Sequence, residues 1–241
     1  MRFRLLTYNI HKAIGGLDRQ YRPDRVIETI RHCQPDIALL QEVDDGVPRS
    51  RHHRQVDLLG DALNLHHRAY QPNVILKEGR YGNAILSRFP LSDVQDLDLT
   101  VPLKKRRGAL IAHCRLREDQ HSHTLLLVNV HLGLAGFERT IQVRRILASD
   151  TIQHTRQTTG VILAGDYNDV WNSLGRRLLE PAHFRAACLR IKTFPAMFPV
   201  RALDRVYVRG PLTRHHSFAA RTRTARHASD HLPLVVDLVL H

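Results

Sequence analysis

Acidic, amide and imidazole side chains recur directly after short apolar runs of this sequence. Asn9 follows one such run, Glu42 a second, His131 a third, and Asp166 with Asn168 a fourth. A single Asp or Asn in such a place is more often a turn residue. Strand ends in α/β folds, however, hold reactive groups at a shared edge, so the repetition predicts one common site. Carboxylate and amide oxygens bind hard cations, and carboxylate–imidazole pairs move protons.

The elements that would position these side chains alternate along the chain. Apolar runs predict strands, and apolar residues repeated every three or four positions predict helices. We expect strands at 4–10, 36–42, 81–87, 108–116, 124–131, 161–164, 203–208 and 232–240, an edge strand at 93–99, and helices at 23–33, 55–65 and 138–154. Helices recurring between strands indicate an α/β chain with mixed sheets. Residues 1–241 lack a linker-like segment and an internal repeat, which predicts a single domain.

The length and composition are typical of a folded globular chain. The 241 residues are 43% hydrophobic and 24% charged, which excludes a disordered tail or a fibre. No apolar run reaches the length of about 18 residues that a membrane-spanning helix needs, and the N-terminus lacks a signal-peptide pattern. Cys33, Cys114 and Cys188 are isolated, which favours reduced thiols over a disulfide or zinc site. We therefore expect a cytoplasmic protein without a transmembrane segment.

The charge balance is strongly basic. Lysine and arginine number 36 against 23 acidic residues, a formal net charge of +13. Such an excess attracts polyanions, acidic lipid surfaces or phosphorylated substrates. The stretch 200–227 holds seven arginines and one acid, Asp204, and we expect it to form a basic rim beside the site. The alternative is that a GC-rich coding sequence produced the bias, because 31 of the 36 basic residues are arginine.

Seven short motifs follow one another in order. They are Thr7-Tyr8-Asn9-Ile10, Leu40-Gln41-Glu42-Val43, Tyr81-Gly82-Asn83-Ala84-Ile85-Leu86-Ser87, Asn129-Val130-His131-Leu132, Ala164-Gly165-Asp166-Tyr167-Asn168, Leu203-Asp204-Arg205-Val206 and Ser229-Asp230-His231-Leu232-Pro233-Leu234. In this order they resemble the endonuclease/exonuclease/phosphatase superfamily, from residue 7 to residue 234. Gly-Asp-x-Asn at 165–168 and Ser-Asp-His at 229–231 are the most specific pair. The details look closest to small uncharacterised bacterial members.

The resemblance implies a fold and a reaction. The fold would be a four-layer sandwich of two mixed β-sheets flanked by helices, as in DNase I. The reaction would be hydrolysis of a phosphoester by water, with a divalent cation that offsets the negative charge of the phosphate. Mg²⁺ or Mn²⁺ suits oxygen ligands and keeps several waters. We expect Glu42 to be its main ligand, with Asn9 and Asp230 completing the shell directly or through water.

The resemblance also implies roles for the other motif residues. Asp166 would orient and deprotonate the attacking water, and Asn168 would hold the phosphate. Asp204 would fix the tautomer of His231 and favour its protonated form. His131 would contribute a second donor to the phosphate. The motifs leave open whether His131 or His231 protonates the leaving oxygen.

Three further residues are predicted to bind the substrate phosphate. Arg107 precedes a strand and could bind phosphate bidentately, and Asn83 and His11 are assigned to the same group. His11 stands where the apurinic endonuclease branch usually has an acidic residue, which leaves the number of metal ions open. Nucleic acid is slightly favoured as substrate over phospholipid or inositol headgroups. The alternative to an enzyme is a non-catalytic polyanion-binding module that retains the fold, and the oligomeric state stays open.

Overall fold

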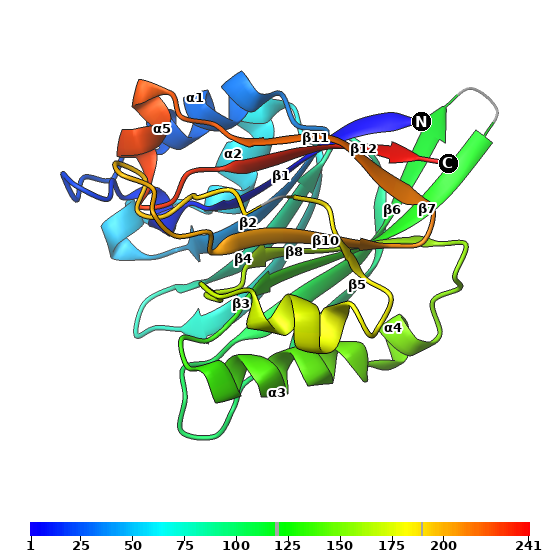
Figure 1. Cartoon of the computed structure of the whole chain (residues 1–241). Coiled ribbons are helices and arrows are strands. Elements are labelled where there is room, and N and C mark those ends of the chain that lie inside the picture. Colours follow the sequence, from blue (N-terminus) through cyan, green and yellow to red (C-terminus); the bar gives the residue numbers. More distant parts are fainter. Residues whose placement is uncertain (119–120, 189) are drawn as a thin grey trace.

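Two six-stranded sheets, each with mixed strand directions, face each other (Figure 1). The structure is a computed structural model that describes residues 1–118, 121–188 and 190–241. The first sheet has the order β11-β12-β1-β2-β4-β3 and the second β5-β6-β7-β8-β10-β9. The first contains β1 (Arg2–Asn9), β2 (Ile37–Asp45), β3 (His67–Ile75), β4 (Arg80–Ser87), β11 (Leu212–Ala219) and β12 (Leu234–Leu240). The second contains β5 (Leu91–Asp98), β6 (Gly108–Glu118), β7 (His121–His131), β8 (Gly160–Asp166), β9 (Arg185–Ala186) and β10 (Asp204–Arg209).

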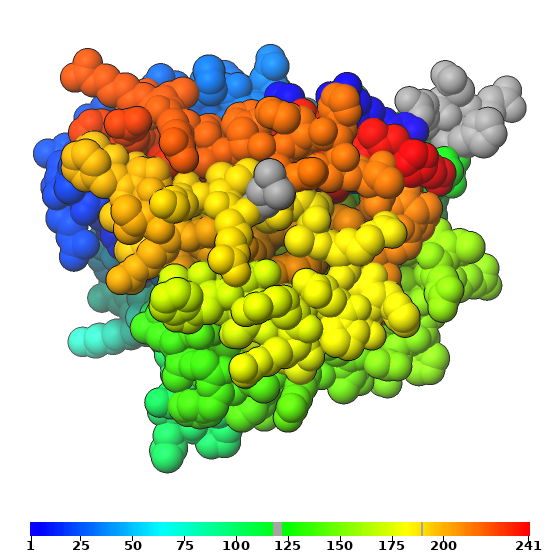
Figure 2. Space-filling view, in the orientation of Figure 1, coloured from blue at the N-terminus to red at the C-terminus, as the bar shows by residue number. Residues whose placement is uncertain are grey.

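Helices cover the outer face of each sheet. The helices are α1 (Pro23–Cys33), α2 (Gln55–Leu63), α3 (Gly136–Leu147), α4 (Asp150–Gln153) and α5 (Arg223–Ala228), with shorter helical turns at His11–Ala13, Pro48–Ser50 and Gly175–Leu179. Figure 1 shows α1, α2 and α5 over one sheet and α3 and α4 over the other, and Figure 2 shows the same view with all atoms drawn. The predicted four-layer fold is therefore confirmed.

Strands buried on both faces explain the apolar runs of the sequence. In β1, Leu5 joins the core between the sheets, and its neighbour Leu6 joins the core under α1 and α2. Leu39 and Leu40 divide in the same way on β2. A third apolar cluster lies between the second sheet and α3. Each central strand thus supplies two cores, because successive side chains point to opposite faces.

Three strands and one helix were missed in the sequence, and one predicted helix is wrong in its extent. β3 contains Pro72 and β11 is mostly exposed, and both lie at sheet edges, where polar residues and proline are tolerated. β9 has only two residues, and α5 only six. The helix expected over 138–154 is two helices, because Ser149 adopts an extended conformation (φ −68°, ψ 142°) between α3 and α4.

The strand directions gather six strand ends at one edge. β1 runs parallel to β2, and β7 runs parallel to β8, so their carboxyl ends lie together in each sheet. β12 is antiparallel to β1, and β10 is antiparallel to β8, so the amino ends of these two strands reach the same edge. The polar residues that end or precede these strands are thereby brought together.

A buried amide joins the two sheets near this edge. The Asn129 Nδ2 group on β7 donates to the carbonyl oxygens of Leu40 and Ala84, each at 2.8 Å. Its Oδ1 atom accepts a hydrogen bond from Gln41 Nε2, also at 2.8 Å. Buried polar groups are costly unless they are paired. The pairing of Asn129 therefore favours a single alignment of the second sheet against β2 and β4.

At Gly165, β8 lies too close to β7 to leave room for a side chain. Its φ of +146° disfavours side chains, and a Cβ atom there would lie 1.9 Å from the Val130 carbonyl oxygen. Gly165→Ala should lower the free energy of unfolding by at least about 1–3 kcal/mol, measured by urea denaturation. The matched control is Gly136→Ala at the start of α3, where the nearest atom is 3.8 Å away and stability should not fall. Equal stabilities of the two variants would contradict this interpretation.

Candidate active site

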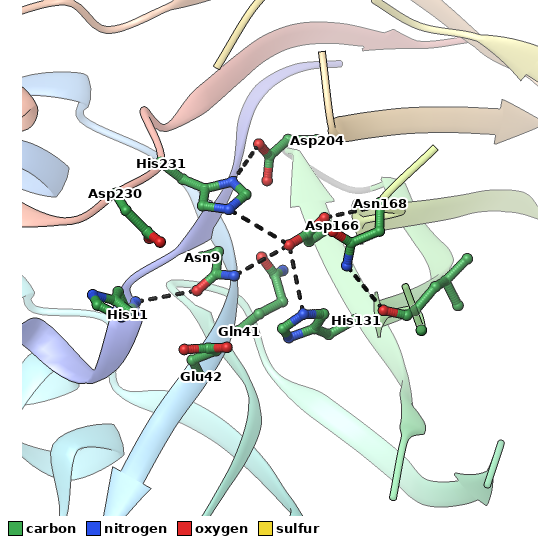
Figure 3. Close-up of polar contacts among 12 residues, drawn as sticks. Asn9, His11, Gln41, Glu42, His131, Asp166, Asn168, Asp204, Asp230 and His231 are labelled. Carbon is green, nitrogen blue, oxygen red and sulfur yellow. Dashed lines mark hydrogen bonds and ion pairs between the residues drawn. The ribbon is translucent and has the colours of Figure 1, made fainter. Parts of the chain in front are cut away.

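Asp166 lies at the centre of the polar cluster because of strand register. It is the last residue of β8, and it faces His131 of β7 on one side and Asp204 of β10 on the other. Figure 3 shows the side chains of Asn9 and His231 reaching the same carboxylate from the first sheet side. The site is thus built from both sheets, at the edge where their strand ends meet.

The Asp166 carboxylate is buried and surrounded by donors. Oδ1 accepts a hydrogen bond from the Asn168 backbone N–H at 3.0 Å, and Oδ2 accepts one from Asn9 Nδ2 at 3.2 Å. Oδ2 also lies 3.5 Å from His131 Nε2 and 3.7 Å from His231 Nε2. Burial raises the pKa of Asp166 to about 6, although the charge of His231 opposes the shift. A carboxylate with such a pKa is suited to accept a proton near neutral pH.

His231 is held by a buried carboxylate on its other nitrogen. Its Nδ1 atom lies 2.9 Å from Asp204 Oδ2, which also accepts a hydrogen bond of 2.5 Å from the Thr193 hydroxyl. The Phe194 ring packs against the imidazole at a centroid distance of 4.9 Å. Burial alone would lower the pKa of His231, but Asp204 and Asp166 outweigh it and raise the pKa to about 10. His231 is therefore an imidazolium at neutral pH.

His131 has the opposite protonation state. Burial and the nearby positive charge of Arg107 lower the pKa of His131 well below its usual range. His131 is therefore neutral at neutral pH and carries one ring proton. The two imidazoles that face Asp166 thus differ in charge. Only His231 carries a second ring proton, so it can give up the proton on Nε2 while Nδ1 stays hydrogen-bonded to Asp204.

Glu42 points into the site because β2 is irregular there. The β2–β4 pairing shifts register between Leu40 and Val43, and Glu42 has a φ of +57°. Such bulges re-aim side chains near active sites, and a positive φ in a non-glycine residue is unfavourable. The Lys12 ammonium forms an ion pair with Glu42 Oε2. Burial opposes ionisation, but the charge of His131, which is protonated only in the acidic range, and the charge of Lys12 outweigh it and lower the pKa of Glu42 to about 2.

The oxygen atoms of Asn9, Glu42 and Asp230 point toward one space (Figure 3). Within the described residues, no group of three or more His, Cys, Asp and Glu side chains could hold a metal ion. A cation at this place would therefore have two carboxylates, one amide and water as ligands. Such a set fits Mg²⁺ or Mn²⁺, which are bound by few carboxylates and retain water, and it does not fit zinc.

Comparison with known proteins agrees with this geometry. Residues 6–231 match the sequence profile of the Endonuclease/Exonuclease/phosphatase family. The chain belongs to this family. YbhP, an uncharacterised protein of Escherichia coli strain K12, is 30% identical over 253 residues that span 99% of this chain and 96% of YbhP.

Solved structures of other members share the fold. An endonuclease/exonuclease/phosphatase from Beutenbergia cavernae DSM 12333 has a TM-score of 0.80 at 21% identity, covering 99% of this chain and 72% of that one. The mannosyl-6-phosphatase Bt3783 of Bacteroides thetaiotaomicron VPI-5482 has a TM-score of 0.77 at 16% identity, covering 99% and 100%. At these identities the likeness concerns the fold alone.

The residues that we assigned to the substrate phosphate lie in different surroundings. Asn168, predicted to hold the phosphate, has a φ of +51° and donates from Nδ2 to the Leu132 carbonyl oxygen at 3.0 Å. Arg107 is buried close enough to His131 to lower its pKa. The backbone N–H of His11 donates to Asn9 Oδ1 at 3.1 Å. The three residues thus lie beside the polar cluster around Asp166, and the phosphate-binding roles predicted for them stay predictions.

Asn83 lies between the two sheets of this family fold. It is fully buried, and its Nδ2 group donates to the Gly108 carbonyl oxygen at 3.0 Å and to Gln71 Oε1 at 3.3 Å. This contact joins β4 to the start of β6, next to Arg107. The phosphate-binding role that we assigned to Asn83 stays a prediction, and its visible contact is structural.

Three side chains at the site received no role from the sequence. Lys12 was visible next to the Asn9 motif, but nothing there indicated its ion pair with Glu42. Thr193 belongs to none of the motifs, although its hydroxyl binds Asp204. Ser229 lies within the last motif, and its hydroxyl donates to the Asn9 carbonyl oxygen at 2.7 Å. Such contacts cross long sequence separations and could not be predicted from spacing.

The basic rim expected over 200–227 stays a prediction, because two of its seven arginines make contacts within the protein. Arg205 is buried in β10 and donates to the Asp169 carbonyl oxygen at 3.3 Å. Arg209, on the same strand, stacks on the Phe184 ring at 5.1 Å. A basic group does form elsewhere, where Lys12, Arg49 and Lys105 surround the Tyr81 ring at 5.6, 5.2 and 5.2 Å. Positive charge near Glu42 thus comes from several loops instead of one stretch.

The protonation of His231 can be tested without an activity assay. Asp204→Asn should lower the pKa of His231, because the neutral amide no longer balances the imidazolium. An NMR titration of the imidazole protons should show His231 charged at neutral pH in the wild type and losing its proton near pH 10. The surface variant Asp93→Asn, next to His113, should leave His231 unchanged. A neutral His231 at pH 7 in the wild type would contradict the assignment.

Proposed function

We propose that this protein is a divalent-metal-dependent hydrolase of phosphoester bonds. The observation that carries the proposal is the buried carboxylate of Asp166 between a neutral His131 and a charged His231. Membership of the Endonuclease/Exonuclease/phosphatase family supports the same reaction class. A binding module without catalysis would have no use for a proton acceptor and a proton donor that face each other in a buried site.

Asp166 is the general base of the proposed reaction. Its Oδ2 atom is 3.5 Å or more from both imidazoles, so its remaining lone pairs are available to a water molecule. Asn9 and Asn168 hold the carboxylate in place through hydrogen bonds. The carboxylate takes a proton from the water as the water oxygen attacks phosphorus, and the fixed orientation removes the entropy cost of aligning the two groups.

His231 is the charged donor to the phosphate. Asp204 occupies Nδ1, so the proton on Nε2 faces the site. As the P–O bond to the leaving group breaks, negative charge grows on the leaving oxygen, and the imidazolium stabilises it or gives it the Nε2 proton. The neutral His131 donates one hydrogen bond to a phosphate oxygen. This division of roles follows from the opposite pKa shifts of the two residues.

Glu42, Asn9 and Asp230 are proposed to hold Mg²⁺ or Mn²⁺. When bound, the cation supplies positive charge to the phosphate oxygens and so lowers the barrier to attack by water. Glu42 is ionised down to low pH, as a metal ligand must be. The Lys12 ammonium pairs with Glu42 Oε2 and so helps to keep this carboxylate ionised.

Removal of the metal should abolish hydrolysis of a phosphodiester, and addition of Mg²⁺ or Mn²⁺ after EDTA should restore it. Glu42→Gln should raise the metal concentration needed for half-maximal rate, because it removes a charge and keeps the side-chain shape. Calorimetry of metal binding should show the same weakening. The control is Glu78→Gln on the exposed β3–β4 turn, which should bind metal like the wild type. Full activity in EDTA would refute the proposed metal.

Loss of the base should slow turnover without unfolding the protein. Asp166→Asn should reduce kcat by about 10²–10⁴-fold, the usual contribution of a positioned acid or base. It should not lower the melting temperature, because burial of the ionised carboxylate is itself unfavourable. Asp150→Asn, at an exposed position on α4, is the matched control and should keep the wild-type rate. If both variants turn over substrate equally well, Asp166 is not the base.

A further inference from the structure

Large apolar side chains are exposed on loops around the site. Of the nine such side chains in the described part of the chain, five lie on four loops and a sixth, Phe137, lies in the first turn of α3. We call these six the apolar tips. They are Leu103, Leu134, Phe137, Trp171, Phe198 and Val200. Single exposed apolar residues are normal and are usually scattered. The six apolar tips, in contrast, are concentrated on a few neighbouring segments, which suggests a functional surface.

The apolar tips lie on segments that adjoin the catalytic strand ends along the chain. Leu134 and Phe137 follow His131 by three and six residues, and Trp171 follows Asn168 by three. Phe198 and Val200 precede Asp204, and Leu103 precedes Arg107. Figure 1 shows the strand ends and loops of this edge at the end of the molecule opposite the two chain termini. An apolar surface that the tips touch would also face the site.

Cations accompany the apolar tips. The Lys104 ammonium lies 5.4 Å from the centre of the Phe137 ring, and so connects the loop of Leu103 with the first turn of α3. Arg190 donates to the Trp171 carbonyl oxygen at 3.4 Å. Arg201 directly follows Val200 and is exposed. Long basic side chains placed beside apolar ones suit a surface that is apolar inside and anionic outside.

Acidic residues are missing from the loops that carry most of the apolar tips. The stretches 99–107, 132–137 and 190–203 contain no Asp or Glu, although the whole chain has 23. Each lysine or arginine near an anionic bilayer strengthens binding, and an acidic residue would oppose it. The charge of this end is therefore complementary to an anionic lipid surface.

We propose that the active-site end docks on an anionic phospholipid bilayer through the apolar tips, so that the phosphoester it hydrolyses belongs to a lipid headgroup. This inference rests on the proposed hydrolase function. The tips enter the apolar boundary of the bilayer, and Lys104, Arg190 and Arg201 contact phosphates of neighbouring lipids. Nucleic acid fits less well, because three of the six tips, Leu103, Leu134 and Val200, are aliphatic and cannot stack on bases.

Trp171 provides a direct test, because it is the only tryptophan of the chain and one of the apolar tips. Vesicles of phosphatidylcholine mixed with phosphatidylglycerol should shift its emission to shorter wavelength, and brominated acyl chains should quench it. Vesicles of phosphatidylcholine alone should have a much weaker effect, because they lack the anionic charge. No shift and no quenching with the mixed vesicles would overturn the docking proposal. A shift with duplex or single-stranded DNA, but not with vesicles, would overturn it in favour of nucleic acid.

A double variant separates docking from catalysis. Leu103→Asp with Phe198→Asp should weaken vesicle binding by about a hundredfold, because burying one such side chain is worth about tenfold or more in an equilibrium. Hydrolysis of a small soluble phosphodiester should be unchanged, since neither residue belongs to the catalytic cluster. The matched control is Val94→Asp, an exposed apolar residue on the edge strand β5, which should bind vesicles like the wild type. Equal weakening by the control would contradict docking through the tips.

The two proposals fail in different ways. Vesicle binding by a protein that hydrolyses no phosphoester would refute the hydrolase function and leave only the docking surface. Hydrolysis of the soluble diester by a protein that ignores vesicles would refute the docking and leave the hydrolase. Hydrolysis of phosphatidylglycerol in vesicles that falls with the double variant, at an unchanged rate on the soluble diester, would support both.

Discussion

A carboxylate buried where two sheets meet is the constraint on which the site depends. Asp166 loses its hydration at this edge, and an unpaired buried charge is too costly to persist. The protein supplies compensation from both sheets: the amide of Asn9, the backbone N–H of Asn168 and the charge of His231. The compensation is partial, so the pKa of Asp166 rises to about 6 instead of falling. That intermediate pKa suits the carboxylate to the role of base that we propose for it.

The same constraint accounts for the charges of the two imidazoles. His231 has a carboxylate on each side, so its proton is retained, whereas His131 is buried beside Arg107 and loses its second proton. Strand register sets these neighbours, since Asp204, Asp166 and His131 lie opposite one another on three adjacent strands. The alignment of this trio with the residues of the first sheet depends in turn on the buried Asn129 amide between the sheets. Packing and proton chemistry therefore share one set of contacts.

The sequence allowed the fold and most members of the cluster to be predicted, since central strands are apolar and their polar ends fall in motifs. The His231–Asp204 pair was expected and is present. The edge strands β3 and β11 were missed because edge strands tolerate proline and polar residues, and neither strand shows a regular apolar pattern. The direction of the Glu42 side chain depends on a β-bulge, and its ion pair with Lys12 depends on a loop contact. Neither feature can be predicted from the spacing of residues in the sequence. Arg205, counted in the expected arginine rim, is buried, because composition does not say which arginines reach the surface.

The central claim is that Asp166 and His231 work in opposite protonation states. The pH dependence of kcat/KM for a small phosphodiester, at saturating metal, tests it most directly, because that profile reports the essential base and acid of the free enzyme. The account predicts a rate that rises as Asp166 ionises near pH 6 and falls as His231 loses its proton near pH 10. In Asp204→Asn the falling limb should move to lower pH, with the rising limb in place. A rate that stays constant as the pH falls through about 6, or a falling limb that does not move in Asp204→Asn, would contradict it.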